Sequence, residues 1–146
     1  MAPFPEPVPG LVIRYSYLWR REHLAGREEG QKDRPCAIVA SVRTEAGALR
    51  VLVLPVTHTP PDADTVAVEI PEFIKKRIGM DDERSWIVIS EYNDFVWPGP
   101  DLRPAAHDKG GAISYGLLPG SLFEKVRTAW LELAMKRCSS PVRRTE

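Results

Sequence analysis

The 146-residue sequence lacks the short patterns that identify most cofactor-dependent and metal-dependent enzymes. It contains no GxGxxG, no Walker loop, no GxSxG and no HExxH, and its three histidines, His23, His58 and His107, are scattered along the chain. Phosphate-cofactor and zinc chemistry therefore have no support in the sequence, and we expect neither a cofactor nor a bound metal.

Cysteines and long apolar runs are also scarce. Cys36 and Cys138 form no CxxC and have no histidine at ligand spacing, so we interpret both as reduced thiols. Residues 1–9 are proline-rich and acidic where a signal peptide would be basic and then apolar, and no apolar run approaches the length of a membrane span. These features predict a cytoplasmic protein with no membrane partner.

Net charge is absent as well. The 20 Lys+Arg and 20 Asp+Glu residues cancel, so the molecule as a whole has no long-range attraction for a polyanion. This balance weakens a nucleic-acid function but is compatible with a local basic groove. A chain of this length can bury a core without disulfides or a structural metal.

The patterning that is present predicts a mainly β fold in one domain over residues 10–138, between a flexible proline-rich arm at 1–9 and a frayed tail at 139–146. Alternating apolar residues predict a first strand from Gly10 to Tyr17, and charged residues 19–33 predict a long surface loop. Further strands are expected at 35–42, 49–56, 65–70 and 85–92, with a short sixth at 95–97.

The second and third of these strands are apolar on both faces around a turn at 44–47, which predicts a central antiparallel hairpin. Pro71 and Gly79 bracket a short helix. A capping box from Ser121 to Glu124 predicts the start of an amphipathic helix, whose apolar stripe is Leu122, Val126, Trp130 and Leu133. Short strands with one late helix indicate a small antiparallel barrel that the helix covers.

Arg34 enters the second strand and Thr57 ends the third, so antiparallel pairing would make them neighbours. A guanidinium and a hydroxyl can together hold a scissile phosphate and stabilise its transition state. RNA supplies its own nucleophile, the 2′-hydroxyl, so no metal is needed. Alternatively, Arg34 only pairs with a carboxylate such as Asp33, and Thr57 is only a β-former at a strand end.

The order of these features resembles the MazF/PemK (Kid) family of ribonuclease toxins. The elements that carry the resemblance are Gly10-Leu11-Val12 opening the first strand, Gly26-x-Glu28-x-Gly30 in the loop, Arg34-Pro35 entering the second strand and Pro55-Val56-Thr57 ending the third. The later strands and the final helix are similar in order, so the resemblance covers most of the chain.

This resemblance implies an SH3-like barrel, a homodimer, and a metal-independent, sequence-specific endoribonuclease acting on single-stranded RNA. It also implies the toxin of a type II toxin-antitoxin system, neutralised by a cognate antitoxin whose disordered tail occupies the RNA groove. By position, Arg34 and Thr57 correspond to the family's catalytic arginine and threonine, and Glu28 to its loop acid near the substrate groove.

The sequence departs from the family where His58 replaces a serine and Glu91-Tyr92 replaces Asp-Gln. His58 is either a general acid or base or a surface histidine. Glu91 and Asn93 either border the groove or are polar residues at a strand end. Two further candidates for RNA binding are Lys32, for the phosphate backbone, and Tyr17, as a stacking platform that is otherwise a core residue.

Two other functions stay open at this stage. One is a non-catalytic barrel of the same ancestry that binds a protein or nucleic acid, which neutral charge and the altered positions favour. The other is a toxin that poisons DNA gyrase, which only fold analogy supports.

Overall fold

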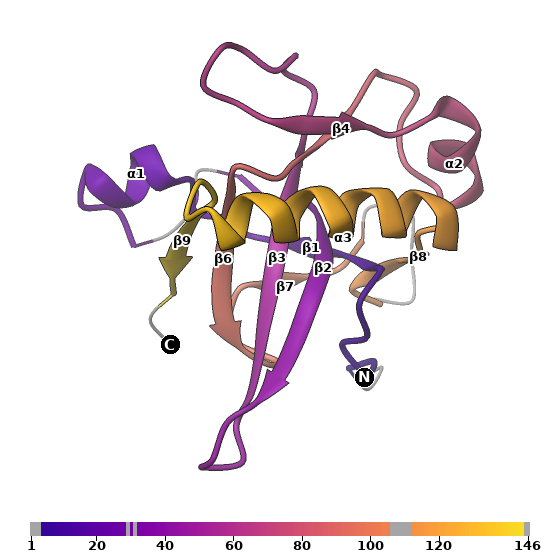
Figure 1. Ribbon diagram of the computed structural model, residues 1–146. Helices are drawn as coiled ribbons and strands as arrows, with labels where there is room; N and C mark the ends of the chain where they lie inside the picture. The colour runs from indigo at the N-terminus through magenta and orange to yellow at the C-terminus, as the bar shows by residue number, and fades with distance from the viewer. Residues whose placement is uncertain (1–3, 29, 31, 106–111, 145–146) are drawn as a thin grey trace.

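The computed structural model describes residues 4–28, 30, 32–105 and 112–144, and this part of the chain is mainly β, as the sequence predicts (Figure 1). It contains nine strands and three helices. In chain order they are β1 (Leu11–Tyr15), α1 (Arg20–Leu24), β2 (Arg34–Arg43), β3 (Leu49–Thr57), β4 (Ala67–Glu69), α2 (Glu72–Arg77), β5 (Trp86–Val88), β6 (Glu91–Val96), β7 (Leu102–Arg103), β8 (Ser114–Leu117), α3 (Gly120–Met135) and β9 (Ser140–Arg143).

The strands form one open sheet in the order β4-β5-β3-β2-β1-β7. Three further strands branch from this path: β6 pairs with β3, β9 pairs with β6, and β8 pairs with β1. All pairings are antiparallel except that of β6 with β9, which is parallel. The path ends at β4 and β7 without closing, so the structure confirms the mainly β prediction but shows an open sheet where a small antiparallel barrel was predicted.

The predicted central hairpin of β2 and β3 is confirmed. Cys36 lies opposite Pro55 and Arg43 lies opposite Leu49, and the turn between the strands holds Gly47 at φ +86°, a conformation that L side chains rarely adopt. Alternating residues of this hairpin enter two separate cores because side chains on a strand point to opposite faces. Leu54 and Val56 join one core, and Val53 joins the other.

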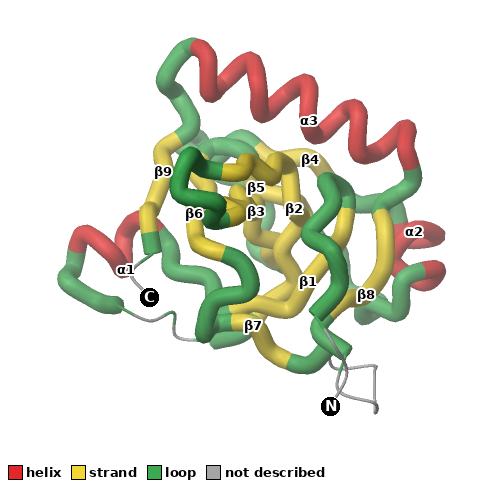
Figure 2. Tube along the Cα trace, turned by 90° about the horizontal axis from the view of Figure 1, so that it is seen from below, coloured by secondary structure: helices red, strands yellow, loops and turns green. Residues whose placement is uncertain are grey.

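Helix α3 lies along one side of the strands and closes the first core (Figure 2). Its predicted apolar stripe is confirmed, with Leu122, Val126 and Trp130 buried. The predicted capping box is wrong. The helix begins at Gly120 with Pro119 at the N-cap, and no side chain caps it, because the extended backbone of Pro119 lets the helix start before Ser121.

Several boundaries differ from the predictions. The strand expected at 85–92 is split into β5 and β6, which pair with different parts of β3, and the sixth strand expected at 95–97 is the end of β6. The expected loop at 19–33 contains α1. The short strands β7 and β8 were not predicted, because two to four residues cannot show a period.

The prediction of a frayed tail at 139–146 is wrong for residues 140–144. Residues 140–143 form β9, Val142 is buried in the sheet, and Arg144 beyond it is 3% exposed. Residues 4–9 of the expected arm form neither helix nor strand, although the ring of Phe4 contacts that of Trp97. Among the described residues, no helix has the length and apolar character that crossing a membrane requires.

Candidate functional site

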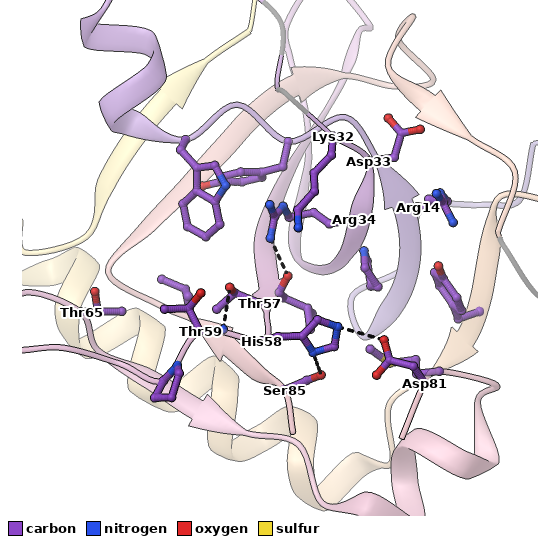
Figure 3. Close-up of a pocket in the computed structure, with 18 of the residues that line it drawn as sticks. Arg14, Lys32, Asp33, Arg34, Thr57, His58, Thr59, Thr65, Asp81 and Ser85 are labelled. Carbon is purple, nitrogen blue, oxygen red and sulfur yellow. Dashed lines mark hydrogen bonds and ion pairs between the residues drawn. The ribbon is translucent and has the colours of Figure 1, made fainter. Parts of the chain in front are cut away.

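The sequence-predicted pair, Arg34 and Thr57, lines an open cavity of about 800 Å³ (Figure 3). The start of β2 and the end of β3 form its floor, because antiparallel pairing brings these two ends together. The beginning of α1 and the segment around Asp81 add to its walls. The predicted adjacency of the two strand ends is therefore confirmed.

The Arg34 side chain lies in the cavity and is only partly held by the protein. Its Nη1 donates to the backbone oxygen of Val56 at 3.2 Å, and its guanidinium stacks over the indole of Trp19 at 4.9 Å from the ring centroid. Burial lowers the pKa of Arg34, because partial desolvation disfavours the charged form. Within the described part of the chain no carboxylate lies within ion-pair distance of it, and Asp33 instead faces Arg103 at 3.7 Å.

Thr57 is half-buried at the last position of β3. Its Oγ1 accepts a hydrogen bond from the backbone nitrogen of Thr59 at 3.1 Å, which fixes the oxygen at the cavity wall. This contact uses a lone pair and not the hydroxyl hydrogen. The hydroxyl can therefore still donate to a bound acceptor.

His58, the next residue, has both ring nitrogens engaged by protein groups. Nδ1 lies 3.0 Å from the backbone oxygen of Arg84 and 3.2 Å from Oγ of Ser85. Nε2 lies 2.9 Å from Asp81 and 3.4 Å from Glu83. His58 therefore presents no uncommitted nitrogen to a substrate, which weighs against a direct acid or base role. The ring nitrogen and the two carboxylates are also the described group whose spacing suits a metal ion.

A buried lysine near the end of α2 holds this cluster in place. Lys75 is 2% exposed, and its Nζ donates to Asp81 Oδ1 at 2.7 Å, to Ser85 Oγ at 2.7 Å and to the backbone oxygen of Glu83. Partial burial would raise the pKa of Asp81, but the hydrogen bond and the positive charge of Lys75 outweigh it and lower that pKa.

The charges around the cavity favour an anion despite the zero net charge of the chain. Four cationic side chains line it without a described carboxylate partner within ion-pair distance: Arg14, Arg21, Lys32 and Arg34. Of the four acidic side chains there, three face a cation: Glu22 faces Arg27, Asp33 faces Arg103 and Asp81 faces Lys75. The fourth, Asp62, accepts hydrogen bonds within its own turn and keeps its charge. The unpaired cations therefore outnumber the unpaired carboxylates.

The other predicted RNA-binding residues lie in different parts of the structure. Lys32 lines the cavity. Tyr17 also borders it, but its side chain is 1% exposed and belongs to the second core, so it is the core residue of the two alternatives, and its hydroxyl donates to Glu91 at 3.1 Å. Burial and the nearby Glu91 carboxylate raise the pKa of Tyr17, and burial likewise raises the pKa of Glu91. Glu28 lies in a second, smaller hollow near the C-terminal strand.

Asn93 does not border a groove, as one of its two sequence predictions had it. Its side chain is 0% exposed, its Oδ1 accepts from the backbone nitrogen of Leu18 at 2.9 Å, and its Nδ2 donates to the oxygen of the same residue at 2.8 Å. It clamps β6 to the segment after β1 and has no surface to offer RNA. A buried asparagine that pairs with a backbone segment 75 residues away leaves no signal in the local sequence.

Comparison of the chain with protein-family models, with curated proteins and with solved structures finds no match. The functional argument therefore depends on the geometry and charge of the cavity.

Proposed function

We propose that this protein is an endoribonuclease that cleaves single-stranded RNA without a metal, and that it acts as the toxin of a type II toxin-antitoxin pair with an SH3-like fold, a homodimeric state and a cytoplasmic location. One observation carries the enzymatic part of the proposal. It is the Arg34 guanidinium, which has no described carboxylate partner and lies beside Thr57 in a cavity whose unpaired charges are mostly positive.

The chemistry follows from these two side chains. The 2′-hydroxyl of RNA gives its proton to water and attacks the adjacent phosphorus, and the bond to the 5′-oxygen breaks as that oxygen takes up a proton from water. Negative charge builds on the non-bridging oxygens in the transition state. Arg34 offers a permanently charged donor to these oxygens, and Thr57 offers a neutral one. The resemblance to MazF/PemK toxins assigns the same two positions to catalysis and supports this interpretation independently of the geometry.

A non-catalytic binding module is the second candidate, and a specific observation favours it. Both nitrogens of His58 are engaged, and the Glu91 carboxylate is used by the Tyr17 hydroxyl and by the backbone nitrogen of Arg20. Neither of these two residues therefore has a free group to accept the proton of a 2′-hydroxyl. Such a site would hold a phosphate or carboxylate group of a partner without breaking a bond.

Cleavage of a mixed-sequence single-stranded RNA pool in excess chelator separates the two candidates. The wild-type protein should cleave it, and Arg34→Ala and Thr57→Ala should each reduce the rate by about two to three orders of magnitude. The control is Arg43→Ala, which removes an exposed arginine at the far end of the same strand and should leave the rate unchanged. An intact RNA pool, with binding that depends on Arg34, would support the binding module instead.

A further inference from the structure

The His58 ring is oriented by an interaction that fixes which nitrogen carries hydrogen. Nδ1 lies 3.0 Å from the backbone oxygen of Arg84, and a carbonyl oxygen can only accept a hydrogen bond. Nδ1 must therefore hold the hydrogen of a neutral ring. The lone pair of Nε2 then points toward the carboxylates of Asp81 and Glu83.

A lone pair that faces two carboxylates is unfavourable unless a cation lies between them. A single proton on Nε2 can serve the Asp81 oxygen at 2.9 Å well, but the exposed Glu83 oxygen at 3.4 Å must then depend on solvent. A divalent ion can contact all three ligand atoms together. We propose that His58, Asp81 and Glu83 form a binding site for a divalent metal ion of the zinc class.

The ligand spacing fits this ion. Zinc binds histidine nitrogen and carboxylate oxygen at about 2.0–2.2 Å, so tetrahedral ligands lie about 3.3 Å apart. The two distances from Nε2 bracket that value, and the three ligand atoms face one another closely enough to share one ion after a small side-chain adjustment.

The surrounding hydrogen bonds have the arrangement that metal sites use to orient their ligands. A ligating histidine commonly donates its other ring nitrogen to a backbone carbonyl, as Nδ1 of His58 does to Arg84. A ligating carboxylate is commonly held by a second donor, and Lys75 bonds Oδ1 of Asp81 while Oδ2 faces His58. The buried lysine thus positions the carboxylate and is not itself a ligand.

Binding would connect the end of β3 to the segment that precedes β5, two parts of the chain more than 20 residues apart. The ion would therefore stabilise the cavity wall next to Thr57. It lies outside the Arg34 and Thr57 pair, so the proposal is independent of whether the protein cleaves RNA.

A zinc titration measured by calorimetry at neutral pH tests the site. The titration uses a Cys138→Ser background, because that exposed thiol could bind zinc by itself. We expect one site per chain and a raised melting temperature with zinc. His58→Gln, Asp81→Asn and Glu83→Gln should each weaken binding by at least about tenfold. His23→Gln, which changes an exposed histidine on α1, is the control and should bind like the background protein.

Acidification should release the ion, because zinc needs the neutral ring. Cobalt in place of zinc should give absorption bands that disappear in His58→Gln. The proposal is overturned if no saturable binding occurs at millimolar zinc, or if the affinity is the same in His58→Gln. It is also overturned if NMR shows that both ring nitrogens of His58 remain protonated at neutral pH with zinc in excess, because then a proton is the resident cation.

Discussion

Arg144 joins the C-terminal strand to the rest of the molecule, and its removal should be among the most damaging single changes. The side chain is 3% exposed, and its Nη2 lies 3.0 Å from the Asp101 carboxylate. The guanidinium also donates to Tyr15 Oη, Ser16 O, Asn93 Oδ1 and Glu28 O, which belong to segments distant in the sequence.

The magnitude follows from what Arg144→Ala would leave behind. Asp101 is 7% exposed, so its carboxylate would stay buried without its cationic partner. Removing one member of a buried ion pair typically costs about 3–5 kcal/mol. The hydrogen bonds to the backbone and to Asn93 are lost in the same step and do not add independently. We expect the free energy of unfolding to fall by about 3–5 kcal/mol, a large share of the 5–15 kcal/mol that domains usually possess.

Urea denaturation measures this difference, and the neighbouring residue supplies the control. Arg143 is 75% exposed and lies 3.7 Å from Asp94, so Arg143→Ala should change stability by no more than about 0.5 kcal/mol. A double variant, Arg144→Ala with Asp101→Asn, should recover part of the loss because the buried charge is gone. If Arg144→Ala unfolds at the same urea concentration as Arg143→Ala, the buried ion pair does not stabilise the tail as we infer.

Three further changes test other parts of the structure. Lys75→Met removes the three hydrogen bonds of a buried ammonium and should lower the free energy of unfolding by about 1–3 kcal/mol in urea denaturation. The control is Lys76→Met, on the exposed side of the same helix, which should lower it by less than about 0.5 kcal/mol. Equal losses would contradict the buried role of Lys75. Burial raises the pKa of Glu91 above its value of about 4.3 in the unfolded chain, so ionisation of Glu91 lowers the stability of the wild type as the pH rises from that value through the folded pKa. Glu91→Gln should therefore gain stability relative to wild type across that pH window and keep the gain above it. A stability difference that does not change with pH would refute this. Gly30→Ala should destabilise the fold in thermal melts, because the added carbon would collide with the backbone oxygen of Tyr17, and an unchanged melting temperature would show that the loop adjusts freely.

The central hairpin and the final helix were predictable because both have long, regular patterns. The apolar residues of β2 and β3 and the stripe of α3 follow the periods that burial on a strand or a helix imposes. The proximity of Arg34 to the end of β3 followed from the same hairpin, because the turn and the strand lengths bring these ends together. The exact register did not follow, because an irregularity between Ile38 and Ala40 shifts the pairing by one residue.

The errors have a common physical origin in long-range contacts. The tail at 140–143 is polar and short, and it forms a strand only because β6 offers it a parallel partner and Arg144 finds a buried carboxylate. Lys75 is buried in spite of its type because Asp81 and Ser85 surround it. Neither partner can be identified from residues within a few positions along the chain.

The central claim is that Arg34 and Thr57 assist attack by the 2′-hydroxyl of RNA, and the most direct test compares two substrates that differ by one atom. The wild-type protein is incubated in excess chelator with a single-stranded RNA and with the same strand carrying a single 2′-deoxynucleotide at the cleaved position. Our account predicts cleavage of the first strand to a 2′,3′-cyclic phosphate and a 5′-hydroxyl end, and no cleavage at that position in the second. Equal cleavage of both strands would contradict it, because the nucleophile would then not be the 2′-hydroxyl.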